Sequence, residues 1–136
     1  MGRPAGNRAR IESGEAAAVT TILLAEDEPA LRAVMIEMLA DEGYLVLEAE
    51  DGVHALEVAE THRGSIDLLV TDAGMPRLGG CELAARLMAL RPETRVVLVS
   101  GGAIDAPDGP GGRPCRVLVK PFRPDALVDF IRAALA

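Results

Sequence analysis

Five short apolar runs, spaced between segments of helical periodicity, constrain the fold more than any other feature of the chain. The runs lie at residues 21–25, 45–49, 66–71, 95–99 and 116–119. Most of them are apolar throughout, so they lack the alternation that marks a strand with one exposed face. Apolar strands that alternate with helices are typical of a parallel sheet covered on both faces. The chain is therefore predicted to have an α/β fold with right-handed crossovers.

Helical patterns separate the first four runs and also follow the fifth. The first helix begins near Pro29, a favoured first helical residue, and is closed by Gly43. Its buried stripe is predicted to comprise Leu31, Val34, Met35, Met38 and Leu39. The second helix is capped by Asp51 and stops at Gly64, and the third ends at Pro92. The last helix occupies the C-terminal end of the chain.

The segment between the fourth and fifth runs breaks this alternation. Residues 101–115 are rich in glycine and proline, where a fourth helix would be expected. Such a composition allows at most one or two turns, around residues 103–106, within a mobile loop. We therefore predict a doubly wound, flavodoxin-like sheet of five parallel strands in the order 2-1-3-4-5, with a reduced or disordered fourth helix.

Composition restricts the domain count and the partners. A chain of 136 residues, of which 49% are hydrophobic, suits one domain with a full core. Residues 1–19 have no periodicity and are expected to be a flexible tail or linker, with one domain over residues 20–136. The formal charge of −7 argues against direct nucleic-acid binding, and no run is long enough to span a membrane. Cys81 and Cys115 match no zinc or redox spacing, which indicates reduced thiols in a cytoplasmic protein.

Polar side chains follow four of the five predicted strands. Glu26 and Asp27 follow the first strand, Asp72 the third, Ser100 the fourth and Lys120 the fifth. Because ligands of open α/β sheets bind at the carboxyl ends of the strands, these residues are expected to share one cleft. Lys120 is also the only lysine among 14 cationic residues, and its compact ammonium suits a single small anion better than the arginine fork does.

This combination of groups is suited to phosphoryl transfer. Clustered carboxylates repel one another and need a cation, and an oxygen-only set of ligands suits Mg²⁺. Mg²⁺ and a lysine beside a carboxylate can neutralise a transferring phosphoryl group, while the aspartate oxygen acts as nucleophile and forms an acyl phosphate. Ser100 can donate a hydrogen bond to a phosphoryl oxygen. Each residue alone has a simpler structural explanation. The prediction therefore depends on all of them lying together at the carboxyl ends of the strands.

Over residues 20–136 the chain resembles the receiver domain of two-component response regulators. The matching stretches are Ile22-Leu23-Leu24-Ala25-Glu26-Asp27-Glu28-Pro29, Leu68-Leu69-Val70-Thr71-Asp72 with Met75-Pro76 and Gly80, Val97-Leu98-Val99-Ser100-Gly101, and Val119-Lys120-Pro121-Phe122. The resemblance implies that a phosphohistidine of a sensor histidine kinase, or of a phosphotransfer domain, phosphorylates Asp72. It further implies a domain that catalyses its own phosphorylation and dephosphorylation without being an enzyme in the usual sense.

The resemblance also assigns roles within the cleft. Asp27 and Asp72 would bind Mg²⁺ together with the backbone carbonyl of Gly74, and Glu26 would act through water. Ser100 and Lys120 would hold the phosphoryl group, and the Lys120–Pro121 peptide bond would be cis. The sequence does not identify the kinase, the downstream target or the signal, and both a stand-alone regulator and a receiver from a hybrid kinase are consistent with it.

Two features depart from the family pattern, and two other readings are open. Val117 occupies a position that is commonly aromatic in the family, and residues 101–115 replace the usual fourth helix.

A receiver fold that no longer accepts phosphate, acting only as an interaction module, is one alternative. A Mg²⁺ phosphohydrolase of the haloacid dehalogenase type is the other, but its nucleophile lies on the first strand, whereas Asp72 follows the third. A P-loop enzyme is excluded because no Gly-x-x-x-x-Gly-Lys motif is present.

Overall fold

A single parallel sheet organises the computed structural model, which describes residues 19–136. The strands are β1 (Thr21–Ala25), β2 (Leu45–Ala49), β3 (Leu68–Asp72), β4 (Arg95–Ser100) and β5 (Arg116–Val119). Their order is β2-β1-β3-β4-β5, which confirms the predicted topology. β3 begins later than its apolar run because pairing with β1 starts only at Leu68, opposite Ile22. Ile66, ahead of that first pair, is nevertheless fully buried.

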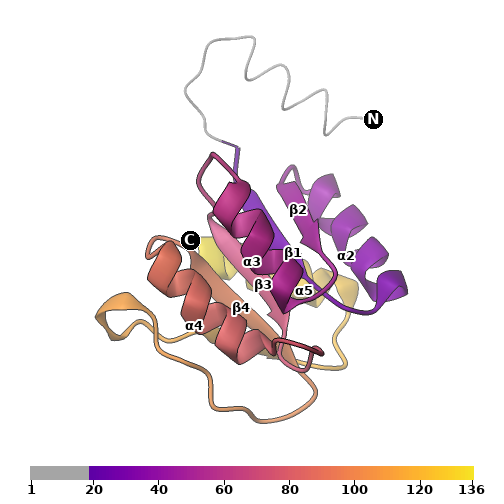
Figure 1. The fold of residues 1–136 in the computed structure, drawn as a ribbon. Helices are drawn as coiled ribbons and strands as arrows, with labels where there is room; N and C mark the ends of the chain where they lie inside the picture. Colours follow the sequence, from indigo (N-terminus) through magenta and orange to yellow (C-terminus); the bar gives the residue numbers. More distant parts are fainter. Residues whose placement is uncertain (1–18) are drawn as a thin grey trace.

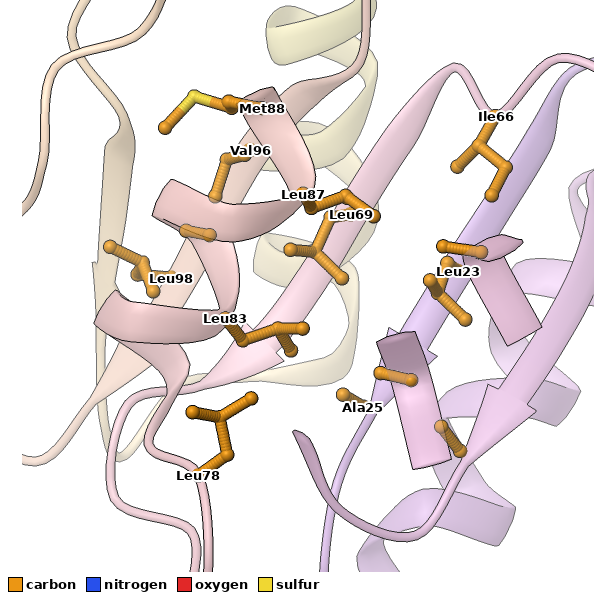
Figure 2. Close-up of a cluster of buried hydrophobic side chains, with 14 of the residues drawn as sticks. Leu23, Ala25, Ile66, Leu69, Leu78, Leu83, Leu87, Met88, Val96 and Leu98 are labelled. Carbon is orange, nitrogen blue, oxygen red and sulfur yellow. The ribbon is translucent and has the colours of Figure 1, made fainter. Parts of the chain in front are cut away.

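Helices cover both faces of the sheet (Figure 1). They are α2 (Pro29–Asp41), α3 (Gly52–Thr61), α4 (Gly80–Leu90) and α5 (Pro124–Leu135). The buried side chains of α3 and α4 belong to one apolar cluster, and those of α2 and α5 belong to another on the opposite face. Figure 2 shows the first cluster, in which Leu83, Leu87 and Met88 of α4 lie over side chains of β3 and β4. Among the described residues, no helix has the length and apolar character needed to cross a membrane.

Two helix predictions need correction. Val34 was expected in the buried stripe of α2 but is 50% exposed, because the sheet covers a narrower face that is centred on Met35 and Leu39. α3 ends at Thr61 rather than at Gly64. Arg91 explains the earlier end, because its guanidinium donates hydrogen bonds to carbonyls of the last helical turn and of the following loop: Ala59, His62 and Gly64. A charged donor thus satisfies backbone acceptors that a helix end leaves free.

The segment between β4 and β5, orange in Figure 1, contains no α-helix, as the composition predicted. No helical turn forms around residues 103–106, where the composition allowed at most one or two, and the only helical turn in this segment is the 3₁₀ turn η1 (Pro110–Gly112). Proline at its first position fixes a helical φ, and Gly111 and Gly112 take positive φ values. Ile104 and Ala106 pack against the cluster under α3 and α4, so an open loop covers sheet surface that a helix would otherwise cover.

Candidate functional site

The carboxyl ends of β1 and β3 bring three carboxylates together. β1 and β3 are neighbours in the sheet, and Ala25 pairs with Thr71, so the residues that follow each of these positions lie side by side. Glu26, Asp27 and Asp72 each place one carboxylate oxygen within 4.8 Å of the other two. The parallel register therefore produces this juxtaposition directly.

Glu26 is the buried member of the group. Its relative exposure is 1%, and its Oε2 accepts a hydrogen bond of 3.1 Å from the backbone N–H of Glu28. Burial raises the pKa of the Glu26 carboxyl, the Glu28 N–H lowers it in part, and the charge of Asp72 raises it further. Asp27 is exposed, so the cleft has one buried wall and one wall open to solvent.

Lys120 reaches Asp72 across the end of β4. Its Nζ lies 2.9 Å from Asp72 Oδ2, and the side chains are 34% and 12% exposed. The hydrogen bond to Asp72 raises the pKa of Lys120. Its backbone N–H donates to the carbonyl of Ser100 at 2.7 Å, and the Lys120–Pro121 peptide bond is cis, as the family resemblance implied. The lysine therefore supplies the ammonium beside the central carboxylate.

Ser100 and Gly74 flank Asp72 in different ways. The Ser100 hydroxyl donates to the carbonyl of Gly102 at 2.7 Å and accepts from its N–H at 3.2 Å, so its hydrogen bonds go to the following loop. The N–H of Gly74 donates to Asp72 Oδ1 at 3.0 Å. Asp72 thus has one oxygen held by a backbone N–H and the other by an ammonium.

The donor set fits a hard divalent cation. It offers oxygen ligands only, and three carboxylates against one ammonium leave an excess of negative charge. Mg²⁺ prefers such oxygen ligands and keeps several of its own waters, so a cleft with one open wall suits it. Glu26, Asp27 and Asp72 are the groups available to hold the ion.

Three contacts around the site were not anticipated from the sequence. Arg32 of α2 donates to the carbonyl of Glu26 at 2.7 Å, and Arg77 forms an ion pair with Asp51. Gly80 begins α4 so close to β3 that a Cβ there would lie 2.2 Å from the carbonyl oxygen of Asp72. The glycine itself belongs to the recognised motif, but its steric role follows only from the structure. The arginines show no local signal, because their partners are distant in sequence.

Fold and site together describe a five-stranded α/β domain with an acidic cleft at its strand ends, and the class of protein follows from comparison with known proteins. A family model of the response regulator receiver domain matches residues 22–132. The chain therefore belongs to the receiver domain family of two-component signalling, whose members work with sensor histidine kinases or phosphotransfer proteins.

Relatives of two different kinds are similar to this chain. The response regulator receiver protein CpdR of Brucella abortus is 36% identical over 84% of this chain and 95% of its own length. The sensor kinase CckA of the same organism is 37% identical over 85% of this chain, but the matched region is only 12% of that kinase. The receiver domain of the hybrid histidine kinase CckA has a TM-score of 0.73 at 34% identity, covering 85% of this chain and 99% of that one.

Proposed function

We propose that residues 20–136 form a phosphoacceptor domain in which Asp72 takes a phosphoryl group from a phosphohistidine in the presence of Mg²⁺. The observation that carries this proposal is the set of contacts that the Asp72 carboxylate makes. Its carboxylate is hydrogen bonded to Lys120 and lies beside the carboxylates of Glu26 and Asp27. The donor would be a sensor histidine kinase or a phosphotransfer domain, and the product would bind a downstream partner differently from the unmodified protein.

The proposed transfer breaks the P–N bond of the phosphohistidine and forms a P–O bond to an Asp72 oxygen. The imidazole leaves with the electron pair of the broken bond, and the product is an acyl phosphate. Lys120 holds the nucleophile and then a phosphoryl oxygen. Bound Mg²⁺ would offset the charge of the phosphoryl oxygens. Attack of water on phosphorus later restores the carboxylate, so the domain catalyses both steps on itself without turning over a separate substrate.

Ser100 gives a route from the acceptor to the rest of the molecule. To donate to a phosphoryl oxygen, its hydroxyl must give up the hydrogen bond to the carbonyl of Gly102. Val117, half-buried on β5, offers no aromatic ring that could report the change. The response is therefore proposed to pass into residues 101–115, which begin at the bonds that Ser100 makes.

Incubation with acetyl phosphate and Mg²⁺, followed by intact mass measurement, tests the proposal. The wild-type protein should gain the mass of one phosphoryl group, and Asp72→Asn should gain none. Asp105→Asn, which changes an exposed carboxylate of the β4–β5 loop, is the matched control and should behave as wild type. Absence of the added mass in the wild type, or an equal gain in Asp72→Asn, would refute the assignment.

The second candidate is an interaction module that takes no phosphate. The replacement of the fourth helix by an open loop favours it, because that region is altered while the fold is intact. The same experiment decides between the two, because only the phosphoacceptor gains mass. Either function is proposed for the cytoplasm, where Cys81 and Cys115, which are unpaired in this structure, would stay reduced.

A further inference from the structure

The loop that joins Asp72 to α4 contains a backbone conformation that arginine seldom adopts. Arg77 has a φ of +68°, and across it the N–H of Leu78 donates to the carbonyl of Pro76 at 2.7 Å. These features define a three-residue γ-turn with a positive central φ, which is rare and strained for a residue with a side chain. Such a turn persists only where the surrounding structure holds it.

Two contacts with the start of α3 hold the turn. The Arg77 guanidinium forms an ion pair with Asp51 Oδ2, while Asp51 Oδ1 caps α3 by accepting from the N–H of His54 at 2.8 Å. The second contact is steric. Leu78 is 7% exposed, and a Cβ on Gly52 would lie only 2.5 Å from the Leu78 carbonyl oxygen. The loop is therefore seated against α3 by a charge pair and by close backbone packing.

Asp51 is suited to be the fixed partner of this pair. Its side chain is 11% exposed, whereas that of Arg77 is 59% exposed, so the carboxylate is anchored and the guanidinium comes to it. The N–H of His54 and then the guanidinium of Arg77 lower the pKa of Asp51, so the carboxylate is ionised throughout the neutral range. Capping and ion pairing use different oxygens of one carboxylate and do not compete.

Gly74 lies between the acceptor and this seated turn. It is exposed, it has no side chain, and its N–H is tied to Asp72 Oδ1 at 3.0 Å. A glycine backbone has unusual conformational freedom, so the direction of its carbonyl depends on what fixes the chain on either side. Asp72 fixes the side that precedes it. Buried Met75 and the Arg77 turn fix the side that follows it.

We propose that Arg77, held by Asp51, is a positioning residue that fixes the loop that follows directly on Asp72 and carries the Gly74 carbonyl. The inference rests on the proposed function, because it takes this carbonyl as a ligand of Mg²⁺. It adds a requirement from outside the cleft: the start of α3 must hold the loop after Asp72 for the ligand set to be complete.

Two variants remove the ion pair between Arg77 and Asp51 and leave the rest of the loop unchanged. Asp51→Asn keeps an N-cap of similar strength for α3 but removes the charge that Arg77 meets, and Arg77→Gln removes the other charge. In full-length protein, NMR titration with MgCl₂ follows the Gly74 amide, and hydrogen exchange of the Leu78 amide is measured without metal. Each variant is expected to weaken Mg²⁺ binding about tenfold, because losing a residue that holds a metal ligand in place commonly has an effect of that size. Each variant should also speed hydrogen exchange of the Leu78 amide.

The controls separate positioning from folding. The double variant should bind Mg²⁺ no more weakly than either single variant, because both remove one contact. Arg86→Gln removes the exposed ion pair between Arg86 and Glu82 on α4. It should change neither the Mg²⁺ affinity nor the hydrogen exchange of the Leu78 amide. Arg77→Gly takes a positive φ without strain, so its unfolding midpoint should stay near that of wild type while its Mg²⁺ binding falls.

The outcomes distinguish this inference from the proposed function. Wild-type Mg²⁺ affinity and Leu78 exchange in both Asp51→Asn and Arg77→Gly would overturn the positioning role, while the proposed function would stand. No Mg²⁺ binding by the wild-type protein would overturn the metal site of the proposed function, and the positioning role with it.

Discussion

Glu26 and Lys120 both have raised pKa values at the strand ends, for different reasons. Burial is the main cause for Glu26, and the hydrogen bond to Asp72 is the main cause for Lys120. Both shifts favour the protonated form of the group. In the protein without metal, they therefore limit the negative charge that gathers around Asp72.

Glu26→Gln should stabilise the metal-free protein at neutral pH. A carboxyl whose folded pKa is raised above 4.5 contributes stability that is complete below that pH and is lost as the pH rises through the folded pKa. Glutamine removes the buried charge and keeps an acceptor for the Glu28 N–H, so a gain of roughly 1 kcal/mol is expected. Thermal unfolding at pH 7 and at a pH below 4.5 checks this, because the gain should vanish in acid.

The gain should carry a functional loss. Glu26→Gln is expected to bind Mg²⁺ more weakly than wild type, because it removes one charge from the acidic cleft. A variant that is destabilised at pH 7, or that gains equally at both pH values, would contradict the raised pKa of Glu26.

Lys120→Arg should lose most of the response to acetyl phosphate although it keeps the charge. The ammonium sits 2.9 Å from Asp72 Oδ2 in a partly closed space, and a planar guanidinium cannot occupy the same point. Misplacing a reacting contact by about 1 Å can cost about a hundredfold in rate. Phosphorylation kinetics measured by mass provide the test, with Arg116→Lys on β5, the strand that leads to Lys120, as the matched control. Wild-type kinetics in Lys120→Arg would show that charge alone suffices.

At the scale of elements, the contact between α4 and β3 ties a helix to the acceptor. Gly80→Ala would place a Cβ 2.2 Å from the Asp72 carbonyl oxygen, and backbone cannot move aside without shifting the strand or the helix. A loss of about 1–3 kcal/mol in the free energy of unfolding is expected from such overpacking. Denaturant unfolding measures it. Gly101→Ala, where a Cβ meets nothing within 4 Å, should leave stability nearly unchanged, and equal losses in both variants would contradict the steric account.

The elements differ in how far sequence could predict them. The sheet order and the cleft followed from apolar runs and from the residues after them, since parallel strands must end at one edge. The missing helix followed from the glycine and proline of residues 101–115. Val34 was misplaced, because periodicity marks an apolar stripe but does not show how much of it the sheet covers. The contacts of Arg32, Arg77 and Arg91 were missed, because each joins a side chain to a partner whose proximity only the folded chain creates.

At the scale of the whole molecule, the sheet separates two apolar clusters, and the cleft lies at the carboxyl ends of its strands. Fixed strand ends suit a site whose groups must meet within hydrogen-bonding distance. The segment between β4 and β5 breaks the alternation of strands and helices, because it contains no α-helix. Ser100 connects the first residues of this segment to the cleft through its hydrogen bonds to Gly102. Recognition of the partner is therefore expected to involve this segment when the acceptor is modified.

The location of the phosphoryl group tests the central claim most directly. After treatment with acetyl phosphate and Mg²⁺, borohydride reduction converts an acyl phosphate of aspartate to homoserine, which tandem mass spectrometry of tryptic peptides can place. The account predicts conversion at Asp72 alone within the peptide of residues 64–77, with Asp67 in the same peptide unchanged as an internal control. Conversion at Asp67 or Asp27, or no conversion at all, would contradict it.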